Sequence, residues 1–132
     1  AVFGLTENYK TLGYVSHQEA IQIQHDAQVL LLVEMDSPET KSIIPGKLFE
    51  YVAANRPILA IGPDGSDVEG ILKETNAGVY FTYTEKEKLK KQLQFYYEAY
   101  SKANLNINSH NTEQYSRREL TKSLSSLLLN IK

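Results

Sequence analysis

Residues 29–61, VLLLVEMDSPETKSIIPGKLFEYVAANRPILAI, decide the fold. Two apolar runs, residues 29–33 and 57–61, enclose a polar loop and a helix-like stretch. An unbroken apolar run of this length is typical of a strand buried on both faces, in a parallel sheet that helices cover. Two such strands with a helix between them form a βαβ unit, so the stretch predicts a parallel sheet.

The same alternation of strands and helices continues on both sides of this stretch. Four segments place Ser or Thr three residues before Glu, the spacing in which the two side chains cap a helix start: Ser16–Glu19, Ser66–Glu69, Thr84–Glu87 and Ser116–Glu119. Together with the apolar spacing they predict strands at 10–15, 28–33, 57–61 and 78–81, and helices at 17–26, 46–55, 67–76, 85–103 and 113–131. We expect an α/β chain, a Rossmann-like three-layer α/β/α arrangement with a short parallel sheet.

Length and composition exclude several classes of protein. The 132 residues fit a single domain, so residues 1–132 are treated as one unit. A formal net charge of -2 gives no electrostatic drive toward nucleic acid. The absence of cysteine excludes disulfides and thiolate metal sites, and nothing in the sequence requires a metal or a cofactor. The apolar runs are too short to cross a bilayer, so we expect no transmembrane segment.

The chemistry is expected in the loop and helix start around Pro45. Ligands of open α/β sheets bind outside the carboxyl ends of the strands, and this loop follows such a strand. Pro45 suits the first position of a helix, and Gly46 allows a ligand to approach the backbone closely. The free amides and the dipole of a helix start attract phosphate, and Lys47 adds a positive charge.

Glu50 follows one turn later. Its two acceptor oxygens could hold the two hydroxyl groups of a ribose while the helix start holds phosphates. Gly and Pro are also ordinary helix punctuation, and a lone Glu on a helix is usually a solvated surface residue. On spacing alone, both interpretations stay open.

A resemblance adds to this pattern. Residues 45–54 and 56–61 resemble glycosyltransferases of the GT-B fold, and are most similar to group-4-like enzymes of bacterial polysaccharide assembly. Residues 13–20 resemble the strand, turn and helix that lie near the donor base in that family, and residues 115–121 resemble its closing helix. The resemblance implies that residues 1–132 are the C-terminal, donor-binding part of such an enzyme.

The implied activity is transfer of a hexose from a nucleotide-diphosphate sugar to a glycan or lipid-linked acceptor. Glu50 would bind the ribose, Pro45, Gly46 and Lys47 would face the diphosphate, and Ser42, Ile43 and Ile44 would lie near the sugar. Backbone or side chains of Gly13, Tyr14 and Val15 would contact the base. No catalytic residue is assigned. The implied location is cytoplasmic, with peripheral attachment at the inner membrane as a further option.

Two departures from the family are visible. Many relatives carry a second Glu eight residues before the ribose Glu, where this chain has Ser42. The Arg and Lys that the first two βα units supply to the diphosphate have no counterpart, and neither does the N-terminal acceptor domain, which we expect as the partner of this unit. We therefore expect the fragment to be inactive alone and strand 10–15 to lack its usual neighbours.

Two hypotheses from another class also remain. The chain could be a Rossmann-like module that binds partners without catalysis. It could also be a receiver-type signalling module in which Asp36, after the first buried strand, acts as the phosphoacceptor.

Overall fold

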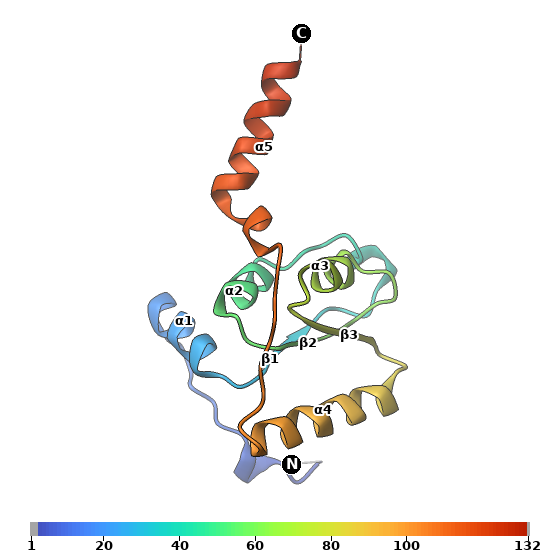
Figure 1. The fold of residues 1–132 in the computed structure, drawn as a ribbon. Helices are drawn as coiled ribbons and strands as arrows, with labels where there is room; N and C mark the ends of the chain where they lie inside the picture. Colours follow the sequence, from blue (N-terminus) through green and yellow to red (C-terminus); the bar gives the residue numbers. More distant parts are fainter. Residues whose placement is uncertain (1–2, 132) are drawn as a thin grey trace.

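The computed structural model describes residues 3–131 and shows an α/β fold. Strands β1 (Leu30–Val33), β2 (Ile58–Gly62) and β3 (Gly78–Thr82) form a parallel sheet in the order β1-β2-β3 (Figure 1). Leu30 pairs with Ile58, and Ile58 pairs with Gly78. The elements between and around them are, in chain order, η1 (Thr6–Asn8), α1 (His17–Asp26), η2 (Pro38–Thr40), α2 (Lys47–Ala54), α3 (Asp67–Thr75), α4 (Lys86–Ser101), η3 (Thr112–Tyr115) and α5 (Arg117–Asn130).

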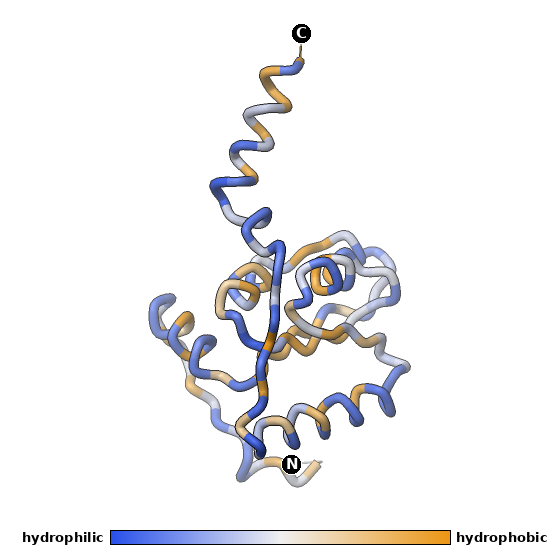
Figure 2. The backbone as a smooth tube through the Cα atoms, viewed as in Figure 1, coloured by the Kyte–Doolittle hydropathy of each residue, from blue (hydrophilic) through white to orange (hydrophobic). Residues whose placement is uncertain are grey.

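Two apolar clusters hold the layers together. Helices α2 and α3 cover one face of the sheet, through a cluster that includes Leu32, Leu48, Ile58, Val68 and Leu72. Helix α4 lies under the other face, where Tyr96 packs with Leu59 and Phe81. The hydropathy colouring shows the same layout, with the strands apolar at the centre and polar turns around them (Figure 2). The predicted three-layer arrangement is confirmed.

The prediction that the first long apolar run is buried on both faces was wrong. In β1, Leu30 and Leu32 are buried, but Leu31 and Val33 are each 55% exposed. The helix on that face, α4, packs against side chains of β2 and β3 and leaves the outer side of β1 open. Because β1 is also an edge strand, Leu31 and Val33 form an apolar surface that nothing in residues 3–131 covers.

The strand expected at 10–15 is absent. Residues 9–15 form no regular structure; Gly13 has a φ of 68° and the Tyr14 side chain is fully exposed. A strand requires a neighbour for its N–H and C=O groups, and no strand of the described residues pairs with this segment. The local sequence favoured a strand, but the sheet of the described residues offers it no neighbour.

The capping pattern was right at some helices and wrong at others. Ser16 and Glu19 form the full capping box, and Ser116 accepts a hydrogen bond from the Glu119 amide. The box at Thr84 does not form, because the helix begins at Lys86 and the Glu85 side chain turns back to the Thr82 amide.

The single helix expected over 113–131 is two elements. Ser116 has extended backbone, with φ -67° and ψ 148°, which ends η3 and lets its hydroxyl cap the start of α5. Helix α5 then projects away from the layered body (Figure 1). No helix of the described chain is long and apolar enough to cross a membrane.

Candidate functional site

The loop after β1 brings the start of α2 to the carboxyl end of the sheet. Ile43 and Pro45 line a small apolar hollow of about 250 Å³ together with Val33, Glu34 and Met35 at the end of β1. The loop is held to the next turn by a hydrogen bond from the Asp67 amide to the Lys41 carbonyl, 2.9 Å. The predicted placement of this helix start beside the end of a strand therefore agrees with the geometry.

Free backbone donors are present at the first turn of α2. The Leu48 amide donates to the Pro45 carbonyl, 2.9 Å, and the Phe49 amide to the Gly46 carbonyl, 3.2 Å. Within residues 3–131 the amides of Gly46 and Lys47 make no hydrogen bond, and both residues are exposed. Two donors at the positive end of a helix dipole can therefore receive an anion.

Lys47 supplies positive charge at this turn, and Lys41 lies in the loop that precedes it. Lys47 is exposed at the start of α2. Lys41, in the preceding loop, places its Nζ 3.9 Å from the position that a Cβ on Gly65 would occupy, so it lies over the turn between β2 and α3. Lys41 is not among the residues predicted from the sequence, although it is the only other Lys or Arg between β1 and the end of α2.

Glu50 is half-buried and turned toward α1. Its Oε2 accepts a hydrogen bond from Gln24 Nε2 at 3.1 Å, and α1 packs beside α2. Burial, with the Glu50 charge as a smaller cause, raises the pKa of the neighbouring Tyr51 hydroxyl. One carboxylate oxygen of Glu50 is therefore engaged by Gln24, while Oε1 makes no hydrogen bond within residues 3–131.

The remaining predicted residues are not gathered into one cavity. Ser42 and Ile44 are exposed in the loop before α2. Gly13 and Tyr14 are exposed and Val15 is half-buried in the segment before α1. The two hollows at the carboxyl end of the sheet are lined neither by Glu50 nor by residues 13–15.

A buried acid that the sequence did not predict lies at the end of β1. Glu34 is only 6% exposed; its Oε1 accepts from the Ser66 hydroxyl, 2.9 Å, and its Oε2 lies 2.7 Å from the Tyr80 hydroxyl. The Tyr83 hydroxyl donates to the Glu34 carbonyl. Burial, followed by the hydrogen bond to Glu34, raises the pKa of Tyr80. Glu34 thus joins the carboxyl ends of β1 and β3 to the turn before α3.

An acidic cleft lies beside this network. It has a volume of about 540 Å³, and its lining includes the carboxylates of Asp36, Asp64, Glu69 and Glu85. Asp36, the residue on which the receiver hypothesis depends, is one of them. Such a lining repels phosphate, so a diphosphate fits the start of α2 better than this cleft. No group of three His, Asp or Glu side chains in the described residues is placed to hold a metal ion.

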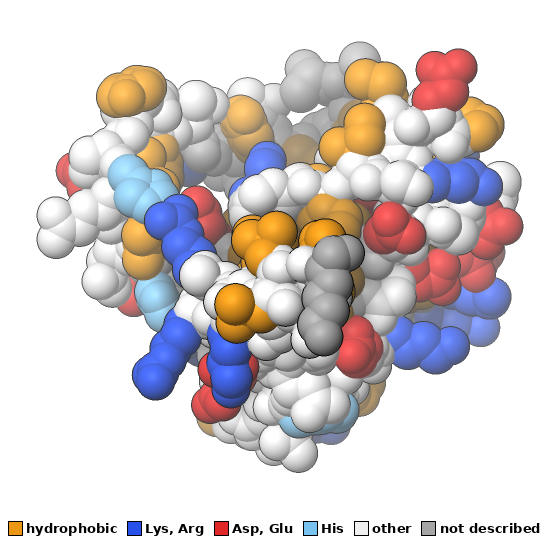
Figure 3. Space-filling view, turned by 90° about the horizontal axis from the view of Figure 1, so that it is seen from above, with side chains coloured by type: hydrophobic (Ala, Val, Ile, Leu, Met, Phe, Trp, Pro, Cys, Tyr) orange, Lys and Arg blue, Asp and Glu red, His pale blue; other side chains and the backbone are white. Residues whose placement is uncertain are grey.

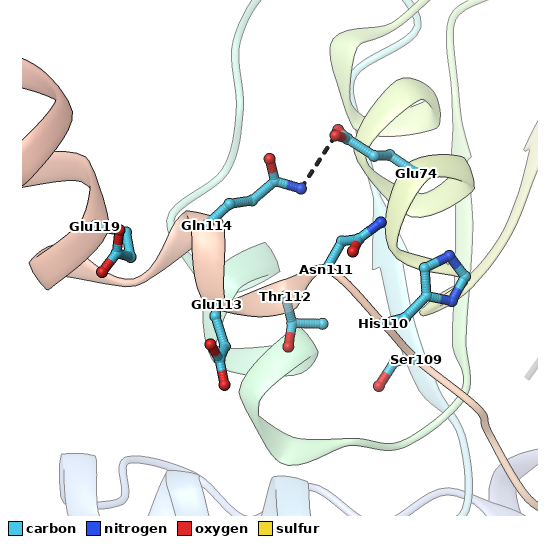
Figure 4. A pocket seen from close by; sticks show the side chains of 8 residues that line it. All are labelled: Glu74, Ser109, His110, Asn111, Thr112, Glu113, Gln114 and Glu119. Carbon is cyan, nitrogen blue, oxygen red and sulfur yellow. Dashed lines mark hydrogen bonds between the residues drawn. The ribbon is translucent and has the colours of Figure 1, made fainter.

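A third, polar hollow lies where the chain crosses the ends of α2 and α3 (Figure 4). We call residues 108–115, which cross there, the strap. The hollow measures about 670 Å³ and is lined by Glu74, Glu119 and residues 109–114 of the strap. Its polar groups bind one another: Glu74 accepts from Gln114, 3.1 Å, and from Tyr115, 2.6 Å.

These bonds shift the titration of both partners. The Tyr115 hydroxyl, followed by the Gln114 amide, lowers the pKa of Glu74. Burial and the bond to Glu74 raise the pKa of Tyr115 to about 12. The Ser109 hydroxyl donates to Asn55 at 2.7 Å and the His110 amide to the Thr75 carbonyl at 2.9 Å. The arrangement fastens the strap to the body.

Comparison of the chain with protein-family models, with curated proteins and with solved structures found no match in any of the three.

Proposed function

We propose that this chain is the nucleotide-diphosphate-sugar-binding part of a glycosyltransferase of the hexosyltransferase type. The observation that carries the proposal is the first turn of α2, where the amides of Gly46 and Lys47 are free beside the carboxyl end of a parallel sheet. Helix starts in this position are common phosphate-binding sites of α/β folds.

The charges around this turn fit a diphosphate. Lys47 lies at the helix start, and Lys41 lies in the loop that leads to it. A departing nucleoside diphosphate develops negative charge, so the free amides and the Lys47 cation at this point would lower the barrier to sugar transfer. The resemblance of residues 45–61 to group-4-like glycosyltransferases supports the same assignment.

Glu50 would hold the ribose through the oxygen that Gln24 leaves free. Gln24 engages Oε2 and fixes the side chain's direction, which would lower the entropy lost when a ribose hydroxyl binds to Oε1. The role of Gly13, Tyr14 and Val15 at the base rests on the resemblance alone. The acceptor would bind an N-terminal domain of the same enzyme, and the activity would be cytoplasmic.

Calorimetric titration with uridine or guanosine diphosphate tests the proposal, with inorganic pyrophosphate as a second ligand. Glu50→Gln should weaken nucleoside diphosphate binding roughly tenfold or more, as expected for loss of hydrogen bonds to a charged group. It should leave pyrophosphate binding unchanged, because pyrophosphate has no ribose. Lys47→Ala should weaken both ligands.

Two exposed residues provide matched controls. Glu39→Gln changes an acid in the same loop, and Lys73→Ala changes a cation on the neighbouring α3. Neither should alter binding. If the chain binds no nucleoside diphosphate at millimolar concentration, or if Glu50→Gln binds as tightly as Glu39→Gln, the proposed function is wrong.

A further inference from the structure

Helix α5 displays an apolar stripe that no part of residues 3–131 covers. Its side chains Leu120, Leu124, Leu127 and Leu128 are 50–64% exposed, and they fall within about 100° of the helix circumference. Ser126 and Glu119 lie toward the opposite side, and Ser123 flanks the stripe. The view down the free end of α5 shows apolar side chains gathered around the helix at the centre of the molecule (Figure 3).

An isolated helix of this length is only marginally stable in water. Among the described elements, η3 is the only one that α5 contacts to more than a slight extent. Its stripe therefore needs a surface outside the described residues if burial is to stabilise the helix.

The charges on this segment differ from those of the rest of the chain. Residues 117–132 contain four Lys or Arg and one Glu, whereas residues 1–116 contain ten Lys or Arg and fifteen Asp or Glu. The overall charge of -2 conceals this segregation. A basic, leucine-rich helix on an acidic body has the charge pattern that an anionic lipid surface attracts.

A second copy of α5 is a poorer partner. Parallel pairing would bring Arg117 and Arg118 of two copies together, and like charges repel. The stripe offers only two heptads, and Leu128 widens it beyond the narrow seam of a coiled coil. Both features favour a flat apolar surface over a second helix.

We propose that α5 binds along the surface of an anionic lipid bilayer. The four leucines of the stripe would enter the boundary between headgroups and acyl chains, and Arg117 and Arg118 in the first turn would extend toward headgroup phosphates. The strap sets the direction of the helix, since Tyr115, just before α5, is bonded to Glu74 and packs against Phe49 with the tilted rings 5.7 Å apart. The body would then be held beside the membrane in a defined orientation. This inference does not depend on the proposed sugar transfer.

Flotation of the full chain with lipid vesicles tests the proposal. The chain should float with vesicles of phosphatidylglycerol and phosphatidylcholine, and much less with phosphatidylcholine alone. Arg118→Gln should lower the partition coefficient roughly fivefold, the usual contribution of one cation at an anionic surface. Added salt should reduce the difference between Arg118→Gln and the unmodified chain.

Leu127→Ser and Leu129→Ser form a matched pair, because they make the same substitution on different sides of one helix. Leu127 is in the stripe, while Leu129 lies outside it and is 81% exposed. Leu127→Ser should lower vesicle binding roughly tenfold, and Leu129→Ser should change it little. Neither residue contributes to the core, so thermal unfolding of the body should be unaltered in both variants.

Three results would overturn the proposal. The first is failure of the unmodified chain to float with anionic vesicles. The second is an equal loss of binding in Leu127→Ser and Leu129→Ser. The third combines two observations: the unmodified chain does not bind vesicles, and sedimentation equilibrium shows a dimer that Leu127→Ser dissociates. The stripe would then be an interface between two copies.

Discussion

At the scale of single residues, Glu34 links several elements at the carboxyl edge of the sheet. Its two oxygens meet hydroxyl groups from the turn before α3 and from β3, and its carbonyl accepts from Tyr83. We expect Glu34→Gln to destabilise the fold by about 1–3 kcal/mol, because an amide replaces one of two buried acceptors by a donor. Urea unfolding measures this change.

The exposed acid Glu39 is the control for that substitution. Glu39→Gln should change the free energy of unfolding by less than about 0.5 kcal/mol, since a surface change away from caps and networks has little effect. Equal effects of the two substitutions would show that the network around Glu34 contributes nothing to stability.

Residues such as Glu34 could not be identified from the sequence. Local patterns report which segments are strands or helices, but Ser66, Tyr80 and Glu34 meet only because three strand ends share one edge. Pro45, Gly46 and Lys47 were recognisable because their chemistry is local to one helix start. The direction of Glu50, by contrast, depends on where α1 packs, and the sequence carries no signal for its bond to Gln24.

At the scale of elements, the close packing of β2 against β3 depends on Gly78. A Cβ at this position would meet the backbone carbonyl of Ile58, which cannot move without breaking the ladder. We expect Gly78→Ala to destabilise the fold by about 2–4 kcal/mol. Differential scanning calorimetry would record the change as a lower melting temperature.

At Gly70, in the helix that precedes β3, we expect an alanine to have the opposite effect from the one at Gly78. It lies inside α3 with open space around the position of a Cβ. Gly70→Ala should stabilise the fold by about 0.5–1 kcal/mol, because alanine loses less backbone entropy in a helix. A loss of stability in Gly70→Ala, or none in Gly78→Ala, would contradict this account of the packing.

Most helices and strands could be predicted from the sequence, because apolar runs and Ser caps are local signals. The failure at residues 10–15 has a physical cause: a strand is defined by its neighbour, and no strand in residues 3–131 lies beside this segment. The failure at Ser116 has a different cause, since the Ser116–Glu119 spacing already indicated a helix start inside the range that was assigned to one helix. The exposure of Leu31 and Val33 depends on which helices cover the sheet, and no pattern in β1 contains that information.

At the scale of the whole molecule, the strap that carries α5 should be sensitive to pH. The pKa of Glu74 is lowered from its usual 4.5 by Tyr115 and Gln114. These bonds therefore contribute fully to the stability of the strap above about pH 4.5. The contribution is lost as the pH falls through the lowered pKa that Glu74 has in the folded state. Amide hydrogen exchange at His110, whose N–H bonds to Thr75, should accelerate in that range.

At high pH the stability of the strap should fall as the pH rises. The pKa of Tyr115 rises from 10.0 to about 12, so its contribution is complete below pH 10 and is lost as the pH approaches 12. Glu74→Gln should remove the acid limb, while Glu113→Gln, an exposed acid of the same strap, should leave it intact. An acid limb that persists in Glu74→Gln would assign the effect to another group.

The central claim is that the first turn of α2 binds the diphosphate of a nucleotide. Two-dimensional amide NMR of the full chain, titrated with uridine or guanosine diphosphate, tests it most directly. The account predicts saturable shifts of the Gly46 and Lys47 amides, with a shift of the Gln24 side-chain amide that Glu50→Gln abolishes. Shifts confined to the acidic cleft around Asp64 and Glu85, or no shift at Gly46 and Lys47 at saturation, would contradict it.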